Sequence, residues 1–373
     1  MDRINNPYHD DKLFLPYHMQ KAMTILSGEI PAPSLIEIDP SDKGCNQACL
    51  HCCFKSNPRR KMIFIDVEAL LHFLKETYDY GTYAYELVGG GEPTNHPQIA
   101  DIVYGIISLA KSNAERPHVG ITTNGVFLHR IFSVAQYLDS VRISVDAPEA
   151  TLYNLLHGVE ARLNHFNKVV DNTKKLIRII GGKRVRLGYL VVPPYNHQEN
   201  VISAAAEFAF SLGVEHLAFR PAILDCAPSR EMWREAARAI AKAKQKYRSG
   251  FIIGGVGGSW KYAVGDYKHP KGVCRTRPLV LAIKADGTIP SCFLYRERIA
   301  ERPAIGHIAQ GFAKVWFSER HRRNIQMTDR MACPQFCKLY RADIALEKLE
   351  KFVMSSTLVP ILADSELDNP HFI

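Results

Sequence analysis

The chain has 373 residues, of which 46% are apolar and 23% charged, which suits one large globular domain with a smaller one. No run of 18 apolar residues occurs, and the N-terminus lacks the basic-then-apolar order of a secretory signal, so we expect neither a membrane partner nor export. The net charge of +9 permits an anionic partner, but the basic residues form short, separated runs typical of solvated helix faces, so we expect no nucleic-acid partner.

The predicted elements begin after a weakly patterned extension, residues 1–34. Residues 34–39 alternate like a short strand between prolines. Further apolar strands are expected at residues 83–88, 118–122, 141–145, 185–192 and 216–220, and amphipathic helices at residues 67–78, 97–111, 127–138, 163–180, 200–212 and 230–246. This strict alternation predicts an α/β fold with a parallel sheet and right-handed crossovers, and six strand–helix units are too few for a closed eight-fold barrel.

A cysteine-rich loop, residues 44–53, follows the first strand. Cys45, Cys49 and Cys52 are separated by three and then two residues, so their thiolates can turn towards one point. Thiolates are soft ligands that suit zinc, copper(I) or an iron–sulfur cluster, and three ligands instead of four leave a position open for chemistry. The alternative is part of a zinc knuckle. Cys53, next to the third ligand, should point away from such a site.

Polar segments follow the next three strands at the same predicted edge. Gly90-Gly91-Glu92-Pro93 follows the second strand, and glycines there let the backbone approach a ligand closely. Asn124 follows the third strand, and Ser144 and Asp146 lie at the end of the fourth. The alternative for these segments is ordinary turn chemistry.

The cysteine spacing and the Gly-Gly-Glu-Pro segment together resemble the radical SAM superfamily. The resemblance implies an open (β/α)6 partial barrel over residues 35–250. It implies that the three cysteines hold three irons of a [4Fe–4S] cluster, whose fourth iron binds the amino and carboxylate groups of S-adenosylmethionine (SAM). The implied SAM contacts are Gly90, Gly91, Glu92, Pro93, Asn124, Ser144, Asp146 and the backbone of His51.

A second cysteine group lies in residues 251–340, where residues 279–292 have the pattern of a hairpin with Asp-Gly at its turn. The spacing of Cys274, Gly287 and Cys292 resembles the SPASM/twitch module of radical SAM enzymes, which implies a small cysteine-rich domain. In this resemblance Cys333 and Cys337 complete the ligands of an auxiliary [4Fe–4S] cluster, although three residues separate them where short members often have two. A four-cysteine zinc ribbon is the alternative. A helix over residues 343–354 opens the last segment, residues 341–373.

The resemblance implies an enzyme whose reduced cluster cleaves SAM to methionine and a 5′-deoxyadenosyl radical, which takes a hydrogen atom from a substrate. We expect the dehydrogenation of a small molecule, with flavodoxin or ferredoxin as electron donor. Nine cysteines without an export signal fit metal ligation in the cytoplasm. Alternatives are an epimerase with Cys226 as hydrogen donor, a peptide-modifying enzyme, and, from another class, a zinc-dependent nucleic-acid-binding protein.

Overall fold

The computed structural model describes most of the chain. The described residues are 16–110, 116–222, 228–247, 250–255, 260, 263–264, 272–296, 302–327, 333, 337 and 339–355. Within these ranges no helix is both long and apolar enough to cross a bilayer.

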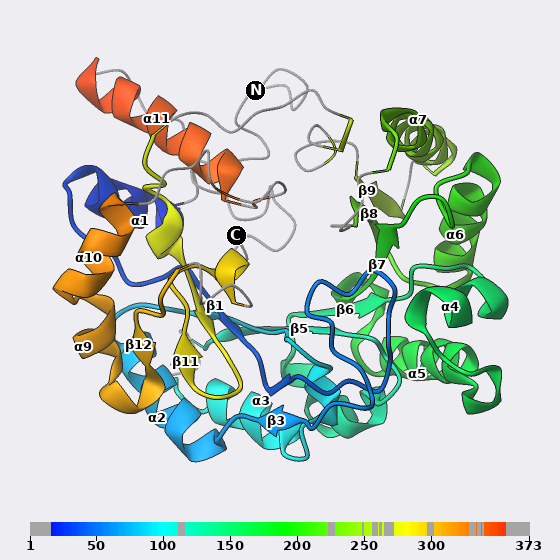
Figure 1. Ribbon diagram of the computed structural model, residues 1–373, viewed down its shortest axis with the longest axis horizontal. Coiled ribbons are helices and arrows are strands. Elements are labelled where there is room, and N and C mark those ends of the chain that lie inside the picture. Colours follow the sequence, from blue (N-terminus) through cyan, green and yellow to red (C-terminus); the bar gives the residue numbers. More distant parts are fainter. Residues whose placement is uncertain are drawn as a thin grey trace.

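An eight-stranded sheet, parallel throughout, forms the centre of the fold, and Figure 1 shows its strands in an open arc with helices around the outside. Six strands match the predicted ones: β1 (Leu35–Ile38), β4 (Ala84–Leu87), β5 (His118–Thr123), β6 (Ser140–Ser144), β7 (Val185–Val191) and β8 (His216–Pro221). The two edge strands are β10 (Val280–Ile283), beside β1, and β9 (Ile252–Gly254), beside β8. The α/β fold with a parallel sheet is therefore confirmed.

Helices cover the outer face of the sheet, and the apolar pattern predicts the approximate position of each of the following except the helix Ala150–His157, which was not expected. They are α2 (Val67–Asp79), α3 (Ile99–Ile107), α4 (Ala150–His157), α5 (His165–Ile180), α6 (Glu199–Leu212) and α7 (Arg230–Lys246). The predicted helix at residues 127–138 is instead a 3₁₀ segment, η4 (Leu128–Tyr137). Its buried residues Leu128, Ile131 and Val134 recur every three positions, which is the period of a 3₁₀ helix.

The two faces of the sheet differ in polarity. In β7, burial alternates along the strand, with Val185, Leu187 and Val191 fully or almost fully buried against the helices. The residues between them, such as Arg186, face the inner side and are only half-buried. Because side chains in a strand alternate between faces, the inner side collects one polar residue from each of several neighbouring strands. The chemistry of the fold is therefore expected on this inner face and at its carboxyl-end rim.

The segment predicted as a separate hairpin is built differently. The turn is present, with Gly287 at φ +80° and its N–H donating to Lys284 O over 2.8 Å. However, β10 joins the large sheet as the parallel neighbour of β1, whereas β11 (Thr288–Ile289) pairs with β12 (Gly306–His307). All four residues of β10 are buried, because a strand inside the large sheet removes more apolar surface from water than a two-stranded hairpin would. The expected cysteine-rich hairpin is thus not confirmed, and the proposed domain boundaries remain predictions.

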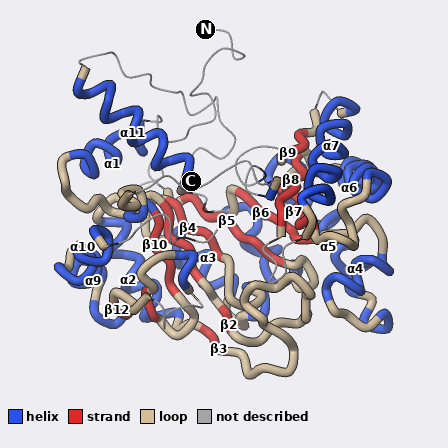
Figure 2. The backbone as a smooth tube through the Cα atoms, turned by 45° about the horizontal axis from the view of Figure 1, so that its top comes forward, coloured by secondary structure: helices blue, strands red, loops and turns tan. Residues whose placement is uncertain are grey.

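Further elements had no counterpart in the sequence prediction. The glycine-rich residues 249–265, for which no strand was expected, contain β9. Helices α1 (Pro16–Leu26), α9 (Phe312–Trp316) and α10 (Glu319–Gln326) were not predicted, and α11 (Tyr340–Met354) begins three residues before the predicted helix. Figures 1 and 2 place α1 and α11 near each other, and Ala22 of α1 and Leu346 of α11 belong to one buried cluster with Leu35 and Val280.

Candidate active site

The cysteine loop lies between two short strands, β2 (Ser41–Asp42) and β3 (Ile63–Phe64), at the carboxyl end of β1. Cys52 N donates to Cys49 O over 3.1 Å, which folds the loop back on itself. Cys45, Cys49 and Cys52 are all partly buried. Burial, followed by the charge of Glu92, raises the pKa of Cys45 to about 12, and burial followed by the charge of Cys45 raises that of Cys49. The thiols therefore share one environment, in which metal binding would have to displace their protons.

The carboxyl end of α4 holds this loop. The last carbonyls of a helix have no partner within it. Here Leu156 O accepts from Leu50 N over 2.9 Å, and His157 O accepts from Ala48 N over 3.0 Å. Gly158, at φ +57°, ends the helix, and a Cβ there would lie 2.3 Å from Ala48 O. The glycine therefore permits both the end of the helix and the close approach of the loop.

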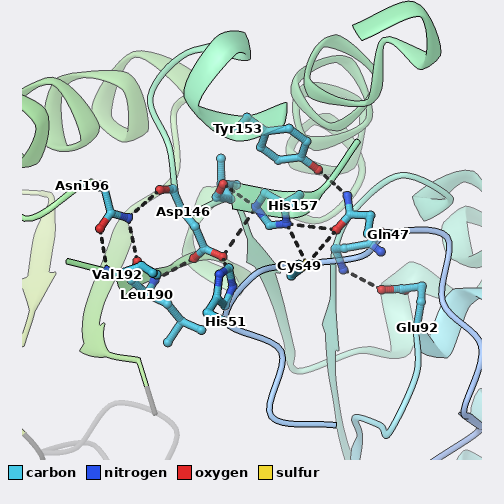
Figure 3. Close-up of polar contacts among 12 residues, drawn as sticks. Gln47, Cys49, His51, Glu92, Asp146, Tyr153, His157, Leu190, Val192 and Asn196 are labelled. Carbon is cyan, nitrogen blue, oxygen red and sulfur yellow. Dashed lines mark hydrogen bonds and ion pairs between the residues drawn. The ribbon is translucent and has the colours of Figure 1, made fainter. Parts of the chain in front are cut away.

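Side chains reinforce the same contact, as Figure 3 shows. Gln47 Nε2 donates to the Tyr153 hydroxyl over 2.7 Å, and Gln47 Oε1 lies 3.0 Å from His157 Nδ1. That nitrogen is also 3.2 Å from Cys49 Sγ. The ring of Tyr153 stacks on His157 with centroids 4.2 Å apart. The sequence analysis missed Gln47, Tyr153 and His157; the available signal was Glu149 and Gly158, which suit the start and end of a helix.

Glu92 joins two strand ends rather than pointing outwards. One carboxylate oxygen accepts from Thr94 N over 3.0 Å and from Thr123 Oγ1 over 2.5 Å, and the other accepts from Asn124 N over 2.7 Å. Burial raises the pKa of Glu92, while these hydrogen bonds oppose the rise. Asn124 Nδ2 in turn donates to Asn46 Oδ1 over 2.7 Å, which connects the cysteine loop to this set of Glu92 hydrogen bonds, called the Glu92 strut below.

The two glycines before Glu92 pack against the cysteine loop and the strand that leads into it. A Cβ on Gly90 would lie 2.2 Å from Asp42 Oδ1, and one on Gly91 would lie 2.4 Å from Gly44 O. Pro93 begins the short η2 (Pro93–Asn95). In this structure the close approach that the glycines permit is between two parts of the chain.

Asp146, at φ +59°, anchors the rim after β6. Its Oδ2 lies 3.1 Å from His51 Nε2, and its Oδ1 accepts from Leu190 N over 2.6 Å. Burial acts to raise the pKa of Asp146, but the hydrogen bond and charge of His51, together with the charge of His157, outweigh it, so the pKa lies below its usual value. Ser144, half-buried, is the last residue of β6 at the same rim.

The structure brings all the predicted N-terminal site residues to the carboxyl ends of β1, β4, β5 and β6. Two buried polar atoms there, Asn46 Nδ2 and His51 Nδ1, have no hydrogen-bond partner among the described residues. Buried polar groups normally have partners, so a bound ligand with polar groups, such as SAM, fits this rim. The three cysteines suit a cluster with one open iron. Within the described ranges, no three His, Cys, Asp or Glu side chains are arranged to hold a single metal ion. Cys226 lies outside the described residues.

The second cysteine group also comes together. Cys274 and Cys292 are buried, and Cys333 and Cys337 are partly buried. Burial raises the pKa of Cys274, and the charges of Asp343 and the other three cysteines raise it further. Thr276 N and Oγ1 both donate to Asp343 Oδ1, over 3.2 and 2.7 Å, so α11 is attached directly beside this group.

Comparison with known proteins begins with the family model described as the Radical SAM superfamily, which matches residues 42–205. GTP 3′,8-cyclase of Corynebacterium glutamicum (strain R) is 27% identical over 170 residues, covering 42% of this chain and 41% of the relative. GTP 3′,8-cyclase of Trichormus variabilis (strain ATCC 29413 / PCC 7937) is 25% identical over 182 residues, covering 48% and 54%. The chain thus spans about half the length of the curated relatives it matches.

Solved structures extend the likeness in fold to most of the chain. SuiB of Streptococcus suis bound to S-adenosylmethionine has a TM-score of 0.63 at 15% identity, covering 83% of this chain and 72% of SuiB. Native anSMEcpe with bound AdoMet and Cp18Cys peptide has a TM-score of 0.56 at 15% identity, covering 82% and 86%. The match to the Radical SAM family model over residues 42–205 and the likeness in fold to these two structures agree with the resemblance of the cysteine loop to the radical SAM superfamily.

Proposed function

We propose that this protein is a radical SAM oxidoreductase that dehydrogenates a small molecule in the cytoplasm. The observation that carries the proposal is the convergence of the cysteine loop, the Glu92 strut and the His51–Asp146 pair at one rim of the sheet. This rim opens onto an inner face lined by polar side chains, where a substrate can lie next to the radical source.

Cys45, Cys49 and Cys52 would hold a [4Fe–4S] cluster, and this group would supply the electron for reductive cleavage of SAM to methionine and a 5′-deoxyadenosyl radical. The chain's own part is positioning. The backbone at Gly90 and Gly91 is assigned to the amino group of SAM, and Asn124, Ser144, Asp146 and the His51 backbone are assigned to the rest of the molecule. Dehydrogenation then takes one hydrogen atom to 5′-deoxyadenosine, followed by loss of an electron and a proton from the substrate.

A second [4Fe–4S] cluster held by Cys274, Cys292, Cys333 and Cys337 would supply the acceptor for that electron. Two observations support this cluster: the four thiols lie close enough for their charges to change one another's pKa, and the charges of Arg277 and Arg302 act on Cys292. Burial raises the pKa of Cys292, and the charges of both arginines act against this rise, so the two cations would offset part of the negative charge of thiolates bound to a cluster. Flavodoxin or ferredoxin is the proposed electron donor to the first cluster.

Metal content and SAM cleavage test this function. Anaerobically reconstituted protein should bind about eight irons and eight sulfides, and the Cys45/Cys49/Cys52 triple alanine variant about four of each. With dithionite and SAM, the full protein should release 5′-deoxyadenosine, measured by chromatography, and the triple variant none. Stoichiometric zinc without sulfide would instead support the zinc-binding alternative.

The substrate class is tested separately. The anSMEcpe structure holds a peptide and the curated relatives are named for GTP, so peptides and nucleotides join small molecules in the screen. An epimerase that uses Cys226 would return a hydrogen atom instead of losing an electron. In that case the Cys226→Ala variant would still form 5′-deoxyadenosine but little product.

A further inference from the structure

We infer that the inner face of the sheet at β6–β8 binds an anionic group of the substrate, a carboxylate or a phosphate, through Arg186 and Arg220. This inference rests on the proposed function, because the inner face is a substrate site only if the rim above it performs radical chemistry. It goes further by naming the chemical class that the substrate must carry.

Strand register places three arginines on this face. Arg142 of β6 and Arg186 of β7 are direct neighbours across the two strands. Arg186 also pairs with His216 of β8, and Arg220 lies four residues further along that strand. Because strand side chains alternate with a period of two, His216 and Arg220 point to the same side of the sheet as Arg186.

Arg220 is also next to the catalytic rim. It pairs with Leu190 in the adjacent strand, and the N–H of Leu190 donates to Asp146 Oδ1 over 2.6 Å. An anion bound at Arg220 on β8 is therefore separated by β7 from Ser144 and Asp146, the residues assigned to SAM at the end of β6. This arrangement suits a substrate whose charged end is held on the inner face while its reacting carbon lies next to the SAM site at the rim.

Positive charge exceeds negative charge on this part of the inner face. In the described chain, Glu86 is the acid facing the three arginines; it lies 3.6 Å from Arg142 Nη2 and also accepts from Thr122 Oγ1 over 3.0 Å. The charge of Arg142 and then desolvation, with a smaller effect of Arg186, lower the pKa of Arg220 to about 10, against the opposing effect of Glu86. Arg220 thus stays charged at neutral pH among like charges, a repulsion that an anion would relieve.

The acids nearer β1 do not supply this counter-charge. Arg296 forms ion pairs with both Glu37 and Asp39, and Lys284 Nζ lies 3.6 Å from Asp42 Oδ2. Among the described residues, the acids of the β1 half are therefore already engaged by cations of that half.

Arg220 is accessible to a ligand. Its side chain stays exposed to solvent although the surrounding protein partly desolvates it, and Arg142 and Arg186 are half-buried. A guanidinium binds carboxylates and phosphates with two parallel hydrogen bonds, which fixes the direction as well as the position of the ligand. Arg220 with Arg186 therefore has the chemistry to orient one end of the substrate.

The test measures anion binding directly, with inorganic phosphate and acetate as separate probes. NMR line broadening of ³¹P and ¹³C at constant ionic strength gives the affinity of reconstituted protein for each probe. Arg220→Gln and Arg186→Gln should each weaken binding about tenfold or more, since a charge-assisted pair is lost. Arg220→Lys, which keeps the charge but loses the planar fork, should fall between Arg220→Gln and the wild type.

Arg238→Gln is the matched control, because Arg238 is an exposed residue of α7 that pairs with Glu231 at 2.7 Å and its loss removes the same charge. It should bind both probes as the wild type does. Binding of phosphate alone would assign a phosphorylated substrate, and binding of acetate alone a carboxylate. Circular dichroism on each variant identifies misfolding, and Arg220→Lys remains the informative variant if a glutamine variant unfolds.

The inference is overturned if the wild type binds neither probe, or if Arg220→Gln, Arg220→Lys and Arg238→Gln all bind with wild-type affinity. Release of 5′-deoxyadenosine by the wild type is measured apart from this. Loss of SAM cleavage with intact anion binding would contradict the proposed function alone, and intact cleavage without anion binding would contradict the anion site alone.

Discussion

The contact between α4 and the cysteine loop gives the sharpest prediction, because the chain contains a matched control for it. Gly158 and Gly213 both end helices in the left-handed conformation, at φ +57° and +83°. A Cβ on Gly158 would meet Ala48 O at 2.3 Å, whereas nothing lies within 4 Å of one on Gly213. Substitution of each by alanine imposes similar backbone strain, but only Gly158→Ala displaces the loop.

The magnitudes follow from these contacts. Alanine in the left-handed region costs about 1 to 2 kcal/mol at either position. Displacing the loop from α4 also breaks the Ala48–His157 and Leu50–Leu156 hydrogen bonds, at about 1 kcal/mol each. Gly158→Ala should therefore cost about 3 to 4 kcal/mol in unfolding free energy, and Gly213→Ala about 1 to 2.

Urea unfolding of the metal-free proteins measures this difference, and iron analysis after reconstitution measures its consequence. Gly158→Ala should lose most of the N-terminal cluster, about four irons, together with SAM cleavage, while Gly213→Ala keeps both. Equal stability, iron content and SAM cleavage in the two variants would refute the role assigned to α4.

Three further predictions concern other parts of the chain. Burial lowers the pKa of Lys21 from 10.5 to about 7, so between these values the unfolded chain binds more protons than the native one and stability rises with pH. Lys21→Met should remove that rise, as measured by urea unfolding from pH 6.5 to about 10, and an unchanged pH profile would contradict the assignment. Arg296→Met leaves the buried carboxylates of Glu37 and Asp39 without their cation and should cost about 3 to 5 kcal/mol in the same assay; a loss under 1 kcal/mol would show that the pairs contribute little. Cys292→Ala should stop substrate turnover but keep 5′-deoxyadenosine release by a folded protein, and loss of both would show that the two cysteine groups do not act separately.

Elements whose signal is local were predictable from the sequence. The span of α7 agrees with the predicted residues 230–246, because Ser229 caps its start and Trp233, Ala236 and Ile240 recur at helical spacing on its buried face. The position of β10 was not predictable in this way. Its apolar residues and Asp-Gly turn suit a hairpin equally well, and its actual partner, β1, lies more than 240 residues earlier in the chain. Pairing over such a separation depends on the whole sheet.

Residues of the candidate site also differ in whether local sequence or long-range contacts determine their position. Spacing alone indicates Cys45, Cys49 and Cys52, because these three residues lie close together in sequence. Gln47 and His157 contact each other across 110 positions, so their roles exist only once α4 has docked beside the loop. Arg220 could have been placed on the inner face from strand periodicity, but its neighbours Arg142 and Arg186 come from other strands and depend on register.

The sheet edge relates the two cysteine groups to each other. β1 leads towards Cys45, and β10, which pairs with β1 from Leu35 opposite Val280 to Ile38 opposite Ile283, lies between Cys274 and Cys292 in sequence. Arg296 closes the same edge by pairing with Glu37 and Asp39 at the end of β1. Both groups are thus attached to two neighbouring, hydrogen-bonded strands, and side-chain ion pairs add a second connection. Under the proposed function this edge fixes the spacing between the site of hydrogen abstraction and the electron acceptor. Loss of Arg296 should therefore slow substrate turnover more than SAM cleavage in molecules that remain folded.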